Sequence, residues 1–436
     1  MEIKPFKAYR FDSSIVGDVG NCISPPYDVI SPSLQQQLYK KSDYNIVRII
    51  NGKTTPSDND KNNQYTRAAD YLKGWIEKGI LKQDSTENIY AYIQDFELDN
   101  RHFQRNSFIA LAKLEDFGKA VRPHEETLEE PKIDRLNLKR ATKADSGLVF
   151  MLYEDQQRIA DKIIENNTSQ KPLIDFYDEH NVRHRLFAVT AKDDIDAITK
   201  MISDKSCIIA DGHHRYETAL NYARETANPA AAYQMTAFVN TCNEGLMILA
   251  THRLVGNLRD FQFEKFMSAL KKSFEITEFS FISARNKTKA KQKMSEQLKA
   301  ACDRGQNTFG TYTGNNAFYV AVLKDKQTMN SIAPNMSEAW RSLDVSVLHK
   351  LALEKLLGIG EKELSIGNNV EYIKDTGNAI GESIAKIDEG QKQVAFFMNP
   401  PKMQQLRMVT AAGEKMPQKS TYFYPKMHTG LTINKL

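Results

Sequence analysis

The most informative segment of this chain reads Cys207-Ile-Ile-Ala-Asp-Gly-His-His-Arg-Tyr-Glu-Thr-Ala-Leu-Asn-Tyr222. Its first four residues form an apolar run, which is typical of a buried strand. Asp211 and Gly212 then indicate a tight turn. The apolar residues after the turn recur with helical spacing. The segment therefore predicts a strand, a turn and a helix that begins near His213, which is a repeating element of α/β folds.

The turn carries residue types that suit an anion. A helix N-terminus offers unpaired N–H groups and the positive end of the helix dipole. Gly212 lets the backbone approach a phosphate closely, Arg215 adds a bidentate donor, and His213 and His214 add further donors. Asp211 is suited to hold Mg²⁺ or to accept a proton from a hydroxyl. The alternative is that Asp211 only caps the helix and the histidines are surface residues.

The rest of the chain predicts a mixed α/β fold with a second, smaller domain. Residues 1–255 alternate strand and helix patterns, and this part includes a short strand expected at Tyr44–Ile50. Residues 256–393 are lysine-rich and predict a smaller α+β domain. Residues 394–436 begin with a strand and continue as a tail that we expect to pack back on the site. The functional part is therefore expected in residues 1–255.

Composition excludes several classes of protein. The chain has 436 residues and a net charge of only +4, so bulk charge does not call for a nucleic acid partner. No window approaches the roughly 18 consecutive apolar residues of a membrane span. The N-terminus lacks the apolar region of a signal peptide, and the cysteines form no CxxC pair, so we expect a cytoplasmic protein without a membrane partner. The oligomeric state stays open.

Two further segments before residue 140 are candidates for the site. His124 and Glu125 stand in Arg122-Pro-His-Glu-Glu-Thr127, where a histidine beside carboxylates predicts a base or a metal-ligand pair, with Arg135 nearby. A solvated loop is the alternative. Tyr27 and Asp28 follow two prolines, which predict a stiff loop that presents a ring and a carboxylate to a substrate. The alternative there is a plain turn with a buried tyrosine.

Two late segments add cations and hydroxyl groups. His252 and Arg253 end a predicted strand, and sheet edges often carry sites in α/β proteins. The tail from residue 419 is dense in hydrogen-bond donors for a chain end. For both segments a structural role is the alternative. The tail candidates for phosphate or substrate binding are Lys419, Ser420, Thr421 and Lys426.

A second pair of histidines has metal-like spacing. His180 and His184 stand at i and i+4, which suits a metal on a helix. The apolar residues around them, however, indicate strands on either side of a turn. We therefore expect a structural role for both histidines.

The chain resembles the bacterial family catalogued as domain of unknown function 1015. The resemblance rests on segments spread along the chain, which include Pro25–Ile30, Arg122–Thr127, Ile209–Tyr216, Thr251–Arg253 and Met416–Thr421. The segment around Asp211 also looks like the phosphate-binding turn of the ParB/sulfiredoxin superfamily, and within it most resembles the free serine kinase. This resemblance implies a ParB/sulfiredoxin-like fold for residues 1–255.

The sequence departs from some of these relatives. The place of the reacting cysteine of sulfiredoxin-like enzymes holds His213, and the nearest cysteine, Cys207, is in the strand. Sulfinic acid reduction is therefore not expected. No helix-turn-helix region is recognisable after residue 256, which argues against a partition role.

The predicted activity is that of a phosphotransferase or phosphohydrolase. Asp211 or Asp28 is expected to draw the proton from a hydroxyl, while Arg215, His213 and His214 neutralise the phosphoryl group. Serine and phosphoserine as substrates, with ATP or ADP as the nucleotide, are what the resemblance implies, and Mg²⁺ is expected between phosphate and a carboxylate. The alternatives are a nucleotide-binding ParB-like switch without turnover and a scaffold protein.

Overall fold

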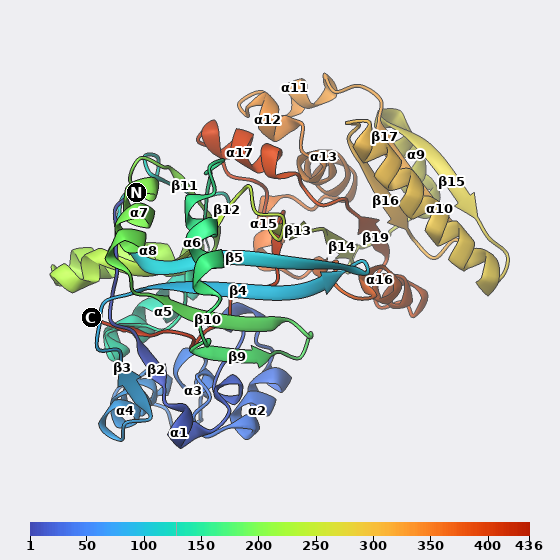
Figure 1. Ribbon diagram of the computed structural model, residues 1–436. Helices are drawn as coiled ribbons and strands as arrows, with labels where there is room; N and C mark the ends of the chain where they lie inside the picture. The colour runs from blue at the N-terminus through green and yellow to red at the C-terminus, as the bar shows by residue number, and fades with distance from the viewer. Residues whose placement is uncertain (128) are drawn as a thin grey trace. The chain divides into compact units, whose positions relative to one another are not determined.

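The computed structural model describes residues 1–127 and 129–436. These residues form a mixed α/β fold, which confirms the predicted fold class (Figure 1). The chain divides into two compact units, and each unit combines segments that are distant in the sequence. The first unit consists of Met1–Pro123, Thr127–Met247 and Pro425–Leu436, and the second unit consists of His124–Glu126 and Ile248–Tyr424.

A mixed sheet forms the centre of the first unit. Its strands follow the order β6–β11–β8–β12–β5–β4–β10–β9, and β1 pairs with β5. The pairs β6–β11 and β8–β12 are parallel, and the other pairs are antiparallel. The strands are β1 (Ile3–Lys4), β4 (Ile89–Leu98), β5 (Arg101–Lys113), β6 (Val121–Arg122), β8 (Val149–Tyr153), β9 (Ile174–Tyr177), β10 (Arg183–Val189), β11 (Cys207–Asp211) and β12 (Tyr233–Asn240).

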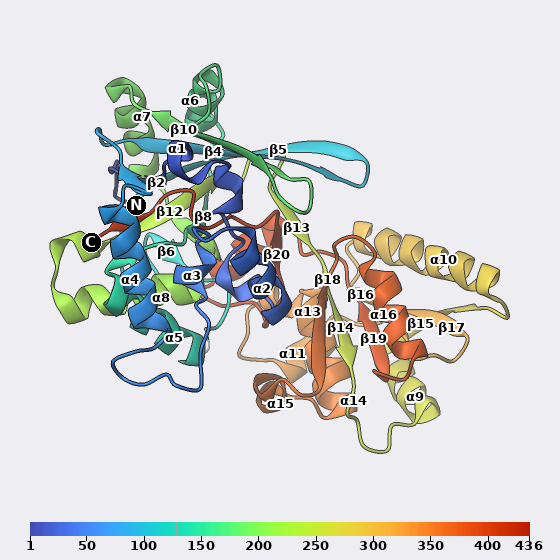
Figure 2. The same ribbon diagram turned by 90° about the horizontal axis from the view of Figure 1, so that it is seen from below.

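Helices cover both faces of this sheet. Figure 2 shows α6 (Ile159–Asn167) and α7 (Lys192–Ser203) on one side of β4, β5 and β10. The helices α4 (Gln64–Glu77), α5 (Glu129–Thr142) and α8 (His213–Thr226) lie on the other side. Two-sided coverage explains why the central strands read as continuous apolar runs rather than as alternating patterns.

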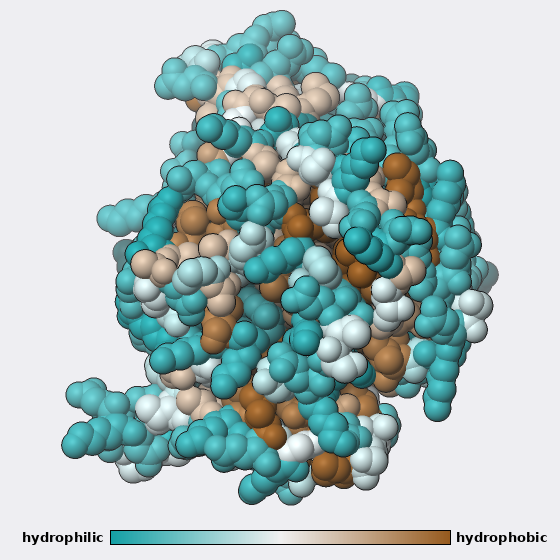
Figure 3. All heavy atoms as spheres, turned by 60° about the vertical axis from the view of Figure 1, so that its left-hand side comes forward, coloured by the Kyte–Doolittle hydropathy of each residue, from teal (hydrophilic) through white to brown (hydrophobic). Residues whose placement is uncertain are grey.

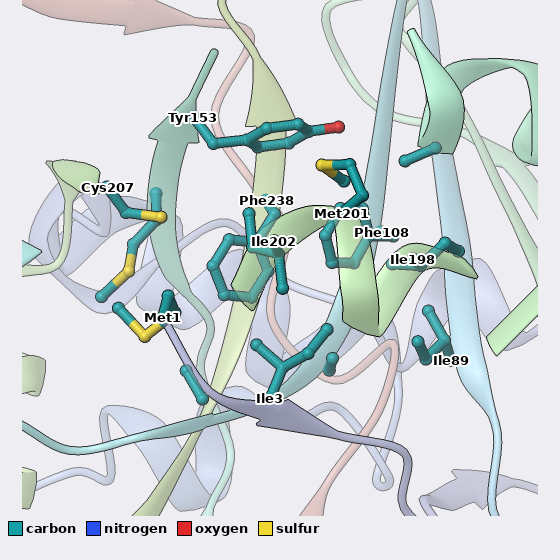
Figure 4. Packing of buried hydrophobic residues seen from close by; sticks show 14 of the residues in the cluster. Met1, Ile3, Ile89, Phe108, Tyr153, Ile198, Met201, Ile202, Cys207 and Phe238 are labelled. Carbon is teal, nitrogen blue, oxygen red and sulfur yellow. The ribbon is translucent and has the colours of Figure 1, made fainter. Parts of the chain in front are cut away.

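Aromatic and aliphatic side chains fill the core under α6 and α7 (Figure 4). Phe108 of β5 and Phe238 of β12 stack with ring centroids 4.9 Å apart. Ile198 and Ile202 of α7 belong to the same cluster, and each is fully buried. Their spacing of four residues places both on one face of α7, as an amphipathic helix requires.

The second unit contains an antiparallel sheet with the strand order β15–β17–β16–β19–β14–β18. The helices α10 (Ala284–Asp303) and α16 (Ala379–Asp388) contribute to its hydrophobic cluster. The strands are β14 (Thr251–Val255), β15 (Phe274–Ser280), β16 (Thr308–Tyr312), β17 (Ala317–Leu323), β18 (Val370–Lys374) and β19 (Val394–Phe397).

The strand expected at Tyr44–Ile50 is wrong, because the segment ends in a helical turn, α3 (Val47–Ile50). The side-chain oxygen of Asn45 accepts a hydrogen bond from the backbone N–H of Val47 at 3.0 Å. This local hydrogen bond favours a turn over the backbone pairing of a β-strand. The β-branched residues of the segment are buried as a turn of helix instead.

Hydrophilic residues predominate on the face drawn in Figure 3, and hydrophobic residues appear there in small separate groups. Scattered apolar groups are normal for a protein surface. Among the helices of the described residues, we find none that is both long and apolar enough to span a lipid bilayer.

Candidate functional site

The predicted strand, turn and helix around Asp211 are confirmed. The strand β11 ends at Asp211 and α8 begins at His213. Gly212 between them has φ of 89° and ψ of 30°, which is the left-handed region. Residues with a Cβ atom adopt this region at a cost, so glycine suits the turn. The turn places Asp211 and the first N–H groups of α8 next to each other.

Asp211 lies between two cations. Its Oδ2 is 2.6 Å from Nη2 of Arg215, and its Oδ1 is 2.6 Å from Nζ of Lys426. The side chains of all three residues are at most 16% exposed. Burial alone would raise the pKa of Asp211, but the charges of Lys426 and Arg215 outweigh it and hold this pKa well below its usual range. The carboxylate is therefore ionised at neutral pH.

The guanidinium of Arg215 lies directly against the N-terminus of α8. Its Nη1 donates to the carbonyl oxygen of Leu148. A Cβ atom on Gly212 would stand only 3.0–3.1 Å from Nε, Cζ and Nη2 of Arg215. Nε is buried and finds no hydrogen-bond acceptor within the described part of the chain. Two features therefore favour glycine at position 212: the left-handed backbone conformation, and the Arg215 guanidinium that occupies the space of a Cβ atom.

Tyr27 and Arg135 form a second part of the site in the first unit. The Cζ atom of Arg135 lies 3.9 Å from the ring centroid of Tyr27, which is cation–π geometry. Arg135 also donates to the carbonyl oxygen of Ile50 at 2.7 Å. Burial raises the pKa of Tyr27, while Arg135 and Arg215 act in the opposite direction. Both guanidinium groups therefore lie close enough to Tyr27 to affect its pKa.

A cavity of about 60 Å³ lies between Tyr27, Arg135 and Arg215. Its wall combines charged, polar and apolar residues. The residues that line it include Tyr27, Arg135, Lys139, Asp145, Ser146, Gly147, Arg215, Thr218, Gln234 and Thr429. The cavity lies entirely within the first unit.

A buried ion pair that no sequence pattern predicted lies in this wall. Nζ of Lys139 is 2.6 Å from Oδ1 of Asp145 and donates to Oε1 of Gln234 at 2.9 Å. Lys139 and Asp145 are 6% and 4% exposed. No local motif marks either residue, because the pair depends on how α5 packs against the sheet.

The other candidates of the first unit take different positions. His213 is 5% exposed, and its charge contributes to the low pKa of Asp211. His214 is half-buried in the first turn of α8. Asp28 is exposed at the start of the 3₁₀ helix η2 (Tyr27–Val29). Asp211, by contrast, accepts hydrogen bonds from Arg215 and Lys426.

In the second unit, the segment with His124 and the tail segment from Lys419 contact each other. Nε2 of His124 is 2.7 Å from Oγ1 of Thr421, and His124 is only 1% exposed. Oε1 of Glu125 accepts a hydrogen bond from the backbone N–H of Lys419 at 3.3 Å and lies 3.7 Å from its Nζ. The segment with His124 and the tail segment from Lys419 are therefore neighbours.

Arg253 and His252 of β14 contact different groups. The Arg253 guanidinium donates to the carbonyl oxygens of Lys419, at 3.0 Å, and of Thr251. Burial lowers its pKa to about 10. Nδ1 of His252 instead accepts from the backbone N–H of Met398 at 3.2 Å. Neighbouring residues of a strand point to opposite faces, so the two side chains do not act as a pair.

Ser420 uses its hydroxyl within the tail, where Oγ donates to the carbonyl oxygen of Pro417. Among the candidate cations, Arg215 and Lys426 lie in the first unit and meet at Asp211. Arg253 and Lys419 lie in the second unit and meet through the Lys419 carbonyl group. Each pair is thus formed within its own unit.

The fold and the site define a mixed α/β protein with a cation-rich helix N-terminus. The chain belongs to the family described as "Protein of unknown function (DUF1015)", which matches residues 3–346. This confirms the predicted family. A search of the curated proteins finds no match.

Three solved structures are similar in chain trace. "Free serine kinase in complex with AMP" is 11% identical, covers 70% of this chain and 83% of its own, and has a TM-score of 0.34. A conserved hypothetical protein from Pyrococcus furiosus is 12% identical, covers 72% of this chain and 95% of its own, and has a TM-score of 0.33. SbnI with C-terminal truncation from Staphylococcus aureus is 9% identical, covers 75% of this chain and 87% of its own, and has a TM-score of 0.34. Free serine kinase is also known in complex with ADP. At these identities and scores the similarity does not define a shared function.

Proposed function

We propose that this protein transfers a phosphoryl group to or from a small hydroxylated metabolite. The observation that carries the proposal is the meeting of Lys426, Arg215 and the N-terminus of α8 around Asp211. Two cations face one carboxylate, and the N–H groups of the helix add partial positive charge. This excess of positive charge suits a phosphate group, which must be neutralised as the phosphoryl group moves.

The low pKa of Asp211 limits what this residue does. A carboxylate with a strongly lowered pKa is a weak base near neutral pH. Phosphoryl transfer passes through a loose transition state and depends mainly on positioning and charge. We therefore assign Asp211 the role of orienting the substrate hydroxyl and holding Lys426 and Arg215 in place. Asp28 remains the other candidate base.

The sequence predicts magnesium at Asp211. Mg²⁺ takes oxygen ligands, and carboxylates are its usual protein ligands. Each oxygen of Asp211 already contacts a cation at 2.6 Å, so this arrangement does not fit a metal bound directly to Asp211. The positive charge that the proposal needs comes from Lys426, Arg215 and the helix N-terminus.

Serine and phosphoserine are the substrates that we propose, because the sequence resemblance around Asp211 implies them. Tyr27 and Arg135 line the same cavity as Arg215 and are proposed to contact the substrate. With ATP or ADP as phosphoryl donor the reaction forms phosphoserine. With water as acceptor the same charges serve phosphoserine hydrolysis.

The proposal is tested by ³¹P NMR of the full-length protein with phosphoserine, and separately with serine plus ATP or ADP, each with Mg²⁺. Arg215→Gln and Lys426→Met are expected to lower kcat/KM by about 100-fold or more, since each removes charge from the phosphoryl group. His214→Ala and Asp211→Ala are also expected to abolish turnover. Arg224→Gln is the matched control, because Arg224 is on α8 but its side chain is 56% exposed and pairs with Asp116.

The turnover and binding measurements separate the proposed activity from its alternatives. Turnover that survives in Arg215→Gln contradicts the assigned site. Nucleotide binding without turnover supports the alternative of a ParB-like switch. Neither binding nor turnover with these substrates rejects the proposed activity.

A further inference from the structure

A cluster of two histidines and an aspartate lies in the first unit, apart from the residues assigned above. Asp178 follows β9, His184 is in β10, and His428 is in the C-terminal segment. One possible ligand atom from each residue lies within 4.8 Å of the other two. The three side chains are 4%, 0% and 7% exposed, respectively. Groups of this polarity are buried only where they are satisfied by one another or by an ion.

The donor atoms converge on one point. Oδ2 of Asp178 is 3.1 Å from Nε2 of His184 and 3.8 Å from Nε2 of His428. Ligands of a tetrahedral zinc ion stand about 3.3 Å apart, given metal–ligand bonds of about 2.0–2.1 Å. The observed separations are thus close to those of a metal centre.

The surroundings hold these groups in position. Oδ1 of Asp178 accepts from the backbone N–H groups of His180, at 2.8 Å, and Val182, at 2.9 Å, which leaves Oδ2 for the imidazoles. The ring of Phe176 stacks on His184 with a centroid distance of 4.8 Å and an interplanar angle of 9°. The carboxylate and the His184 imidazole therefore have little freedom to turn away.

Tyr92 supplies the outer partner that metal-binding histidines usually have. Its hydroxyl is 2.7 Å from Nδ1 of His184. A tyrosine hydroxyl both donates and accepts, so it can bond either tautomer of the imidazole. With Nε2 of His184 bound to a metal, Nδ1–H would donate to the Tyr92 oxygen, so the second ring nitrogen would also have a hydrogen-bond partner, as is usual in metal sites.

We propose that Asp178, His184 and His428 bind one divalent ion of the zinc class. Two imidazole nitrogens and one carboxylate oxygen form a common zinc ligand set. The ion would connect the β9–β10 hairpin to the C-terminal segment, two residues after Lys426. It would thereby fix the segment that brings Lys426 to Asp211. Metal binding is measured without turnover, so the proposal stands or falls independently of phosphoryl transfer.

The test uses the full-length protein after chelator treatment. Zn²⁺ is titrated in competition with a chromophoric chelator, and Co²⁺ is added separately to record the visible absorption of a tetrahedral centre. We expect one ion per chain and loss of both signals in His184→Gln and His428→Gln. His180→Gln is the matched control, because His180 is exposed on the same turn. Tyr92→Phe is expected to weaken zinc binding by about 10- to 100-fold.

Two results would overturn the proposal. One is a wild-type protein that binds no stoichiometric Zn²⁺. The other is binding that persists in both histidine variants, which would place the ion elsewhere. If the variants do not fold, X-ray absorption of the zinc-loaded wild-type protein decides, because the site requires two imidazole ligands and a spectrum without them rejects it.

Discussion

Lys426 and Asp211 are 215 positions apart in the sequence, yet Nζ of Lys426 lies 2.6 Å from Oδ1 of Asp211. The backbone around Lys426 is held as firmly as its side chain. Gln94 donates to the Lys426 carbonyl oxygen at 3.0 Å, and Arg105 donates to the carbonyl oxygen of Pro425. The C-terminal segment therefore delivers a cation to the head of α8 through specific backbone contacts.

Replacing Lys426 with methionine is expected to cost about 1–3 kcal/mol of stability, because a largely buried carboxylate loses one of its two charged partners. Urea denaturation of the wild-type and Lys426→Met proteins measures the difference. Lys435→Met is the matched control, since Lys435 is exposed in the same C-terminal segment. Equal losses in both variants would show that the Asp211 contact contributes nothing.

The Asp211 interaction also predicts how stability depends on pH. The folded-state pKa of Asp211 lies below its unfolded-state value of about 4. Its contribution is therefore complete above that value and is lost as the pH falls through the folded-state pKa. Below pH 5, the free energy of unfolding should fall more steeply with decreasing pH in the wild-type protein than in Asp211→Asn. Asp28→Asn, at an exposed position, should keep the wild-type slope.

Gly212→Ala is expected to destabilise the protein by about 1–2 kcal/mol, because a left-handed residue with a Cβ atom is strained. The added carbon also meets the Arg215 guanidinium at 3.0–3.1 Å, so phosphate or phosphoserine binding should weaken as well. Thermal unfolding and calorimetric titration measure the two effects. Gly74→Ala in α4 is the control: its Cβ would meet no atom within 4 Å, and alanine favours a helix there. A stable Gly212→Ala protein with unchanged binding would refute this account.

Arg253→Met is expected to destabilise the protein by about 1–3 kcal/mol, because the carbonyl groups of Thr251 and Lys419 lose a buried donor. Guanidinium chloride denaturation measures the change. The control is Arg259→Met, which alters another arginine of the same unit. If Arg253→Met keeps its stability but raises KM, Arg253 contacts the substrate instead.

Local patterns predicted the elements well where neighbouring residues alone determine them. The apolar run before Asp211, the glycine and the helical spacing after it predict β11, the turn and α8, and all three are present. The prediction failed at Tyr44–Ile50, where β-branched residues favoured a strand. There the Asn45 side chain and burial of a helical turn outweigh the local preference.

The candidate site was only partly predictable. Tyr27, Arg135 and Arg215 were singled out from their sequence context, and all three line one cavity. The Lys139–Asp145 pair in its wall was missed, since buried ion pairs depend on packing and leave no local signal. His184 was expected to be structural, because its neighbours in the sequence read as strands and its partner His428 is in another part of the chain.

Residue types at short spacing are enough to predict the family, the mixed α/β class and the strand, turn and helix at Asp211. The contact of Lys426 with Asp211 and the meeting of His428 with Asp178 and His184 become visible only in the folded chain. Both depend on one feature of the fold. The path of the C-terminal segment through the first unit is set by long-range hydrogen bonds and packing, and no local pattern encodes where such a segment ends.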